Sequence, residues 1–143
     1  MKALLFIFAI LFSVNVWACP DIRGEYICDS KGKKFAATVL QEQNKNGTMV
    51  YQINSKVFIA DGQWHEFHPN NPDAMAKTNC AGNALIIDIE FDWHEGGEVV
   101  GVRTTRSHIT PAANMFQVEI IGQLTYDDGR VLTDSEAFIC HLQ

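Results

Sequence analysis

The chain has 143 residues, of which 47% are hydrophobic and 20% are charged, and its formal net charge is −6. This length supports one domain of ordinary size and excludes two large domains or a protein with many membrane spans. Because Lys and Arg are outnumbered by Asp and Glu and form no cluster, the sequence also argues against nucleic acid as a partner.

Residues 1–18 predict an export signal. Lys2 supplies a positive charge, residues 3–12 form an unbroken apolar run, and Val16-Trp17-Ala18 forms a signal peptidase site, so we expect cleavage after Ala18. Asn15 interrupts the apolar run well short of the length that a membrane helix needs, so we expect no transmembrane segment in the mature chain. Residues 19–143 are then a single domain that is secreted or periplasmic.

The mature chain contains four cysteines, Cys19, Cys28, Cys80 and Cys140. An even number in an exported protein predicts two disulfides. An alternative is a lipid on Cys19, because residues 16–19 resemble a poor bacterial lipobox, but lipidation would leave an odd number of thiols. The cysteines show no Cys-x-x-Cys spacing, so we expect no metal site built from them.

The composition of residues 19–143 predicts a β protein, because it includes nineteen Val and Ile but only five Leu. Residue pairs that favour hairpin turns separate the apolar runs. These pairs are Asn46-Gly47, Asp61-Gly62, Gly82-Asn83, Gly96-Gly97 and Asp128-Gly129.

Apolar and polar residues alternate most clearly over Leu85–Trp93 and Phe116–Tyr126, which predicts two strands with one apolar face each. Weaker patterns raise the number of strands to about eight. The additional candidates are Ile22–Cys28, Lys33–Gln41, Thr48–Asn54, Lys56–Asp61, Glu98–Ser107 and Arg130–His141.

An antiparallel meander of about eight strands hides its apolar faces and its edges together when it closes into an up-and-down barrel. The alternative is a two-sheet β-sandwich. One longer break interrupts the meander at Gln63–Ala81. Within this segment, Asn71-Pro72-Asp73-Ala74 predicts the start of a helix, with Asn71 as the N-cap and Pro72 at the first helical position.

Gly24-Glu25-Tyr26, on the first predicted strand, resembles the Gly-x-Trp motif of the lipocalin-like calycin barrels, with Tyr in place of Trp. The strand count and hairpin order are similar to that family over most of the mature chain. The resemblance implies a barrel with an interior ligand site. Cys19 to Cys28 also looks like the start of small exported bacterial proteins without an assigned activity.

A barrel would pair its last strand with its first and bring Cys140 near the N-terminal cysteines. Cys19 and Cys28 cannot bond to each other if the chain between them is extended, since nine residues at about 3.3 Å span roughly 30 Å. Two pairings remain, Cys19–Cys140 with Cys28–Cys80 and Cys28–Cys140 with Cys19–Cys80. We expect the first of these.

The sequence predicts no enzyme. It contains no nucleophile elbow, phosphate-binding loop or dinucleotide fingerprint, so we expect no catalytic residue and no cofactor. His65-Glu66-Phe67-His68 is similar to the zinc-peptidase motif His-Glu-x-x-His, but its second histidine comes one residue early, and we expect no metal there.

We therefore expect a disulfide-bonded barrel that binds a small apolar or amphipathic ligand in its interior, with Gln63–Ala81 as a candidate lid. Arg103 and Arg106 lie on opposite faces of one strand, and the one on the apolar side could pair with a ligand carboxylate. We expect this residue to be Arg106, because it shares a face with Val100 and Val102. The predicted ligand-binding residues are Arg106, Phe91, Ile89, Val118 and Trp64.

The alternative is a protein-interaction or inhibitor module of the cell envelope with a solid core. Its loops would then contact a protein partner. Trp64, Phe67 and Trp93 are the candidate anchors, because aromatic side chains are enriched at binding hot spots.

Overall fold

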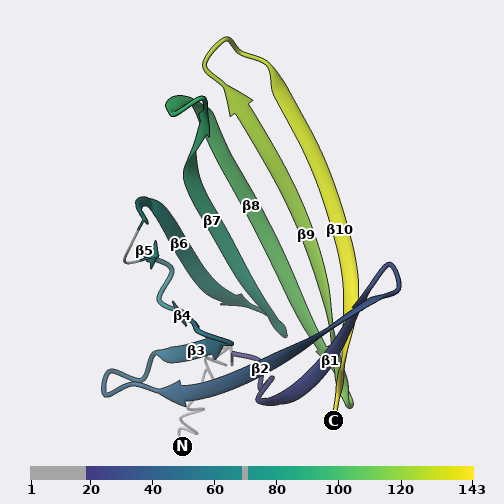
Figure 1. The fold of residues 1–143 in the computed structure, drawn as a ribbon. Coiled ribbons are helices and arrows are strands. Elements are labelled where there is room, and N and C mark those ends of the chain that lie inside the picture. The colour runs from purple at the N-terminus through teal and green to yellow at the C-terminus, as the bar shows by residue number, and fades with distance from the viewer. Residues whose placement is uncertain (1–18, 69–70) are drawn as a thin grey trace, which may run out of the picture.

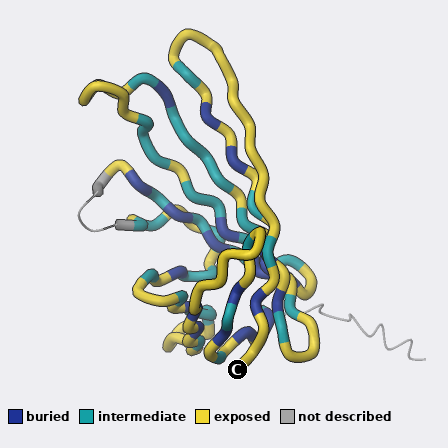
Figure 2. The backbone as a smooth tube through the Cα atoms, turned by 45° about the vertical axis from the view of Figure 1, so that its right-hand side comes forward, coloured by how far each residue is buried: buried dark blue, intermediate teal, exposed yellow. Residues whose placement is uncertain are grey.

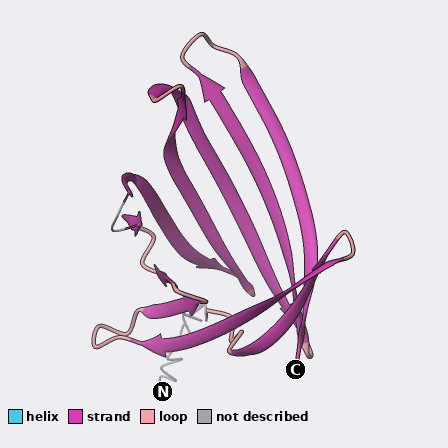
Figure 3. Ribbon diagram, in the orientation of Figure 1, coloured by secondary structure: helices cyan, strands magenta, loops and turns pink. Residues whose placement is uncertain are grey.

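The structure, a computed structural model, describes residues 19–68 and 71–143, and every regular element in these ranges is a β-strand (Figure 3). The strands are β1 (Gly24–Ser30), β2 (Lys33–Gln43), β3 (Met49–Ile53), β4 (Lys56–Ile59), β5 (Trp64–His68), β6 (Asn71–Ala81), β7 (Ala84–Glu95), β8 (Glu98–Ala112), β9 (Met115–Tyr126) and β10 (Val131–Leu142). The all-β class predicted from composition is therefore confirmed.

The export signal predicted over residues 1–18 lies outside the described residues. No helix in the described ranges is long and apolar enough to cross a membrane.

All ten strands belong to one antiparallel sheet that curls almost into a closed barrel (Figure 1). Its order is β4-β3-β2-β1-β10-β9-β8-β7-β6-β5, so every hydrogen-bonded neighbour is also a neighbour in sequence except the pair β1 and β10. The predicted antiparallel barrel and the pairing of the last strand with the first are both confirmed. β7 to β10 are longer than β1 to β4 and extend beyond them, so one side of the barrel forms a tall curved wall.

The prediction for Gln63–Ala81 is wrong. This segment contains β5 and β6 in place of a loop, and the predicted helix start at Asn71-Pro72-Asp73-Ala74 lies in β6, which pairs with β7 from Met75 to Ala81. The inward-facing side chains of β6 are small, since Ala74, Ala76 and Thr78 are buried there. Small residues give little hydrophobic contrast between the two faces of a strand, and therefore the period of two was not visible.

The buried core lies where β1 and β2 cross the lower parts of β7 to β10, whereas the far ends of the long hairpins are mostly exposed (Figure 2). Side chains from both halves of the sheet meet in this core. Tyr26 on β1 packs edge-on against Phe116 on β9, with 4.6 Å between the ring centroids. Leu85 and Tyr51 are completely buried.

The sheet order ends at β4 and β5, whose edges face each other without a backbone ladder in the part of the chain that the structure describes. We call this boundary the seam. Side chains close it. The rings of Phe58 on β4 and Phe67 on β5 lie 5.7 Å apart, and the Lys56 ammonium sits 5.3 Å from the centre of the Phe67 ring. Aromatic and cation–π contacts thus replace the missing hydrogen bonds.

Two disulfides form, as the even number of cysteines predicted, but the expected pairing is wrong. The bonds are Cys28–Cys140 and Cys19–Cys80. The register of β1 and β10 explains the difference, because it places Cys28 directly opposite Cys140. Cys19 precedes β1, so the chain at Cys19 does not follow the β1 ladder and can turn toward the end of β6, where Cys80 lies.

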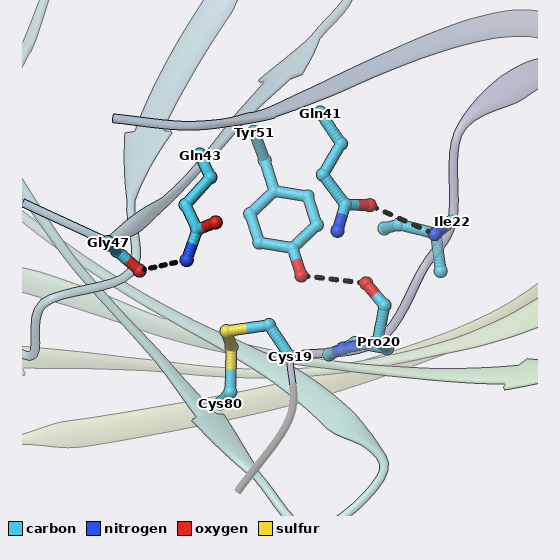
Figure 4. The surroundings of a disulfide bond; sticks show 8 residues. All are labelled: Cys19, Pro20, Ile22, Gln41, Gln43, Gly47, Tyr51 and Cys80. Carbon is cyan, nitrogen blue, oxygen red and sulfur yellow. Dashed lines mark hydrogen bonds between the residues drawn. A yellow bond between two sulfur atoms is a disulfide. The ribbon is translucent and has the colours of Figure 1, made fainter. Parts of the chain in front are cut away.

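The segment from Cys19 to Ile22 is held to β6, β3 and β2 by a disulfide and by hydrogen bonds (Figure 4). The Tyr51 hydroxyl donates a 2.7 Å hydrogen bond to the Pro20 carbonyl, and the Ile22 amide donates to the Gln41 side-chain oxygen at 3.2 Å. Burial, together with the nearby Asp21 carboxylate, raises the pKa of Tyr51 from 10.0 to about 12. The hydroxyl therefore stays protonated as a donor throughout the neutral pH range.

Alkaline pH should therefore destabilise the fold through Tyr51. Its raised pKa means that its contribution is complete below pH 10 and is lost as the pH rises to about 12. This loss should be about 2 kcal/mol. Urea unfolding at pH 9 and at higher values measures it, and the Tyr51→Phe variant is the control, because it cannot ionise. An equally steep fall in the variant would contradict the assignment.

Candidate ligand sites inside and outside the barrel

The interior of the barrel contains an apolar cavity of about 390 Å³. Its walls come from both halves of the sheet. β7, β8 and β9 supply one wall, and the other wall includes Phe35 on β2 and Phe138 on β10, whose rings pack edge-on at 5.4 Å. The main aliphatic lining residues are Ile87, Ile89, Ile109, Val118 and Ile120.

Strand alternation explains why this lining is apolar. Cross-strand neighbours point to the same side of a sheet, and one row of paired residues across β7, β8, β9 and β10 is Leu85, Ile109, Val118 and Phe138. The next row on this face contains Ile87, Ser107 and Ile120. Polar side chains enter the lining at Ser107 and at the turn between β3 and β4, where Asn54, Ser55 and the cationic Lys56 lie.

Arg103 is the arginine of β8 that faces inward, whereas the cation among the residues that line the cavity is Lys56. Arg103 pairs across the sheet with Phe91 and Leu124, and its Nη2 donates a 2.7 Å hydrogen bond to Asp134. The Arg103 side chain is 22% exposed, whereas that of Asp134 is 65% exposed. This is the ion pair nearest to the cavity on the inner face of β8 to β10.

Gly122 makes room for this ion pair. A methyl group at this position would overlap the ends of both the Arg103 and the Asp134 side chains. Gly122 is the next inward-facing position on β9 after Ile120, about 7 Å along the strand. The guanidinium group therefore lies on the inner face beside Gly122, one inward position beyond the cavity-lining Ile120.

Arg106 has a different position from the one expected. It faces the outside of the barrel, where its Nε and Nη2 donate to the two carboxylate oxygens of Asp88 at 2.6 and 3.1 Å. The hydrogen bond to Asp88 raises the pKa of Arg106. The expectation that Arg106 would face the interior is therefore wrong, and Arg103 is the arginine of β8 that faces inward.

The remaining predicted ligand residues separate into two groups. Ile89 and Val118 line the cavity, and Phe91 lies on the same inner face, 6.3 Å from the Trp93 ring. Trp64 lies outside, on the strand next to the seam, with its side chain 44% exposed. The structure therefore does not bring Trp64 and Arg106 together with the three interior residues.

Trp64 and Arg106 instead border a second concave site, which we call the outer groove, with a volume of about 380 Å³. One row of outward-facing neighbours runs across five strands and contains Trp64, Lys77, Asp88, Arg106 and Ile121. The adjacent row supplies Glu90, Thr104 and Gln123. The two rows bound the groove on the outer face of β5 to β9.

The histidine motif gives no metal site in the described part of the chain. The His65 Nε2 atom lies 2.9 Å from a carboxylate oxygen of Asp61, and residues 19–68 and 71–143 hold no group of three or more side chains that could bind a metal ion. The side chain of His68 is outside the description.

Sequence reasoning missed Arg103, Gly122 and Asp134 as a unit, as well as Phe35 and Phe138 on the second wall. Arg103 could have been found from Ile109, which is six residues away and therefore on the same face of β8. The predicted strand ended at Ser107, so it did not include Ile109.

No family model matches the chain, and neither the curated proteins nor the solved structures give a match.

Proposed function

We propose that the protein is an exported barrel that binds a small amphipathic molecule, with the apolar part in the interior cavity. The observation that carries this proposal is the cavity of about 390 Å³, whose lining is dominated by Ile, Val and Phe side chains. Ligand pockets commonly have volumes of about 300–1,000 Å³ and a mainly apolar lining. Each methylene group buried there would contribute about 0.8 kcal/mol. The resemblance of β1 to the calycin barrels favours the same kind of site.

The polar end of the ligand would lie at Arg103. Its guanidinium group lies on the inner face beside Gly122, one inward position beyond the cavity-lining Ile120. Among the described residues it has one hydrogen bond to a protein side chain, from Nη2 to Asp134. An ion pair with one largely exposed partner contributes roughly 0–1 kcal/mol, so a ligand carboxylate can displace Asp134 at low cost. A guanidinium group can then hold the ligand carboxylate with two parallel hydrogen bonds.

We also propose that the protein acts in the periplasm or after secretion, with residues 1–18 removed. The two disulfides support an oxidising compartment, because such bonds persist there and are rare in the cytosol. The Cys19–Cys80 bond also leaves no thiol on Cys19 for a lipid. Lipid attachment at Cys19 is therefore not part of this proposal.

The test compares laurate with lauryl alcohol by isothermal titration calorimetry on the oxidised, processed protein. We expect laurate to bind, and we expect Ile120→Trp, which fills the cavity, to weaken binding by about tenfold or more. Ile121→Trp is the matched control, because Ile121 is the next residue but is 61% exposed on the outer face. Arg103→Gln should weaken laurate and leave lauryl alcohol unchanged.

The outcomes separate the parts of this proposal. If neither amphiphile binds, the proposal of interior binding is wrong and a protein-interaction module takes its place. If Ile120→Trp and Ile121→Trp bind laurate equally well, the cavity is not the site. If both amphiphiles bind and Arg103→Gln changes neither, the cavity holds the ligand but Arg103 does not hold its polar end.

A further inference from the structure

The outer groove is separate from the interior cavity. The sheet lies between them, because most side chains of the groove point outward from the strands whose inward side chains line the cavity, and Ile89 is the one residue that belongs to both linings. The short side chain of Thr104 stands between the longer Glu90 and Gln123 in the same row. The backbone of β7 and β8 therefore lies at the bottom of the groove, and longer side chains form its sides.

Charges in the groove balance. Lys77 and Arg106 are cations, and Asp88 and Glu90 are anions. The Asp88 side chain is only 14% exposed and holds Arg106 through two hydrogen bonds, so this pair is a fixed unit that presents both donors and acceptors. A groove without net charge does not favour an ionic ligand, whereas fixed donors and acceptors side by side suit a neutral ligand rich in hydroxyl groups.

The ends of the groove are apolar. Trp64 stands at one end, with the Lys77 ammonium 5.0 Å from the centre of its ring. Ile121 stands at the other end and is 61% exposed. An aromatic ring offers a flat apolar surface together with an N–H donor, and it needs little ordering on binding because only two of its side-chain torsions rotate. The ligand must therefore carry an apolar face as well as hydroxyl groups.

We propose that the outer groove is a binding site for a neutral saccharide. A pyranose ring combines the two properties that the groove requires, because its C–H groups form an apolar face and its hydroxyl groups both donate and accept. In this site the sugar displaces the Lys77 ammonium from the Trp64 ring and packs against that ring, and its hydroxyl groups bond to the Asp88–Arg106 pair and to Gln123. The volume of about 380 Å³ is in the range of small-ligand sites.

Tryptophan fluorescence tests this proposal directly. The processed chain has two tryptophans, Trp64 and Trp93, so a Trp93→Phe variant reports on the groove alone. We would titrate this variant with cellotriose, maltotriose and N,N′,N″-triacetylchitotriose, and with trigalacturonate as an anionic comparison. We expect a saturable change in Trp64 fluorescence with at least one of the neutral sugars and none with trigalacturonate.

Variants then locate the site by calorimetry. Trp64→Ala and Arg106→Gln should each weaken the sugar that binds by about tenfold or more. Arg103→Gln is the matched control, because it removes an arginine from the same strand but on the inner face, and it should leave sugar affinity unchanged. The midpoint of thermal unfolding should be unchanged by Trp64→Ala, which shows that the variant is folded whether or not laurate binds.

Three results would overturn the proposal. One is the absence of binding by every neutral sugar tested. Another is binding that survives both Trp64→Ala and Arg106→Gln. The third is a preference for the anionic sugar. None of these results bears on the interior cavity, so the two sites stand or fall separately.

Discussion

A variant in which Cys28 and Cys140 are both alanine is expected to lose about 4–5 kcal/mol of unfolding free energy. The bond joins residues 112 apart in sequence, so its removal releases a long loop in the unfolded chain. Both cysteines are also buried in the core, at the pair of strands that links the two halves of the sheet. For a domain of this size the midpoint of thermal unfolding should fall by roughly 15 °C.

The control is the variant that lacks the other bond, Cys19 and Cys80 both alanine. This bond closes a loop with a sequence separation of 61 and anchors the segment before β1. Its removal should cost less, by about 0.5 kcal/mol from loop length alone. Urea unfolding of the oxidised proteins measures both losses. A larger loss in the Cys19 and Cys80 variant would contradict the role assigned to the β1–β10 connection.

Gly101→Ala is expected to destabilise the protein by about 2–3 kcal/mol. A methyl group at this position would overlap the Thr125 carbonyl oxygen and lie 2.9 Å from the Tyr126 Cα. Both obstacles are backbone atoms of β9, the strand that pairs with β8 at this point, so relief requires the ladder to shift. Thermal unfolding of the variant measures the cost.

Gly122→Ala is the matched comparison. Its methyl group would meet only the ends of the Arg103 and Asp134 side chains, which can rotate away toward solvent. The expected cost is therefore below about 1 kcal/mol. Equal destabilisation by the two substitutions would show that the difference between backbone and side-chain obstacles does not control stability here.

The strands with strong alternation were predictable from sequence. Leu85–Trp93 and Phe116–Tyr126 lie within β7 and β9, and all six weaker candidates correspond to observed strands with shifted ends. Closure into a barrel was predictable for a general reason, since a meander of many strands must hide its edges. β5 and β6 were missed because the inward positions of β6 carry small residues, among them Ala74 and Ala76.

Register was harder to predict than strand position. The choice between the two disulfide pairings depended on how β10 lies along β1, and nothing in the alternation of either strand fixes that shift. The prediction that Arg106 faces inward was wrong for a related reason. Val102, which shares a face with Arg106, points outward, and the register of β7 with β8 shifts between Trp93 and His94.

The seam also has a consequence for how the chain is made. β1 to β4 and β5 to β10 are each local meanders, in which every strand pairs with the strand just before or after it. The two meanders are joined in the sheet only through β1 and β10, at the two ends of the domain. Long-range pairing is slow, because a large loop must close before any contact is gained. β1 therefore remains unpaired on one side until synthesis of the chain has delivered β10.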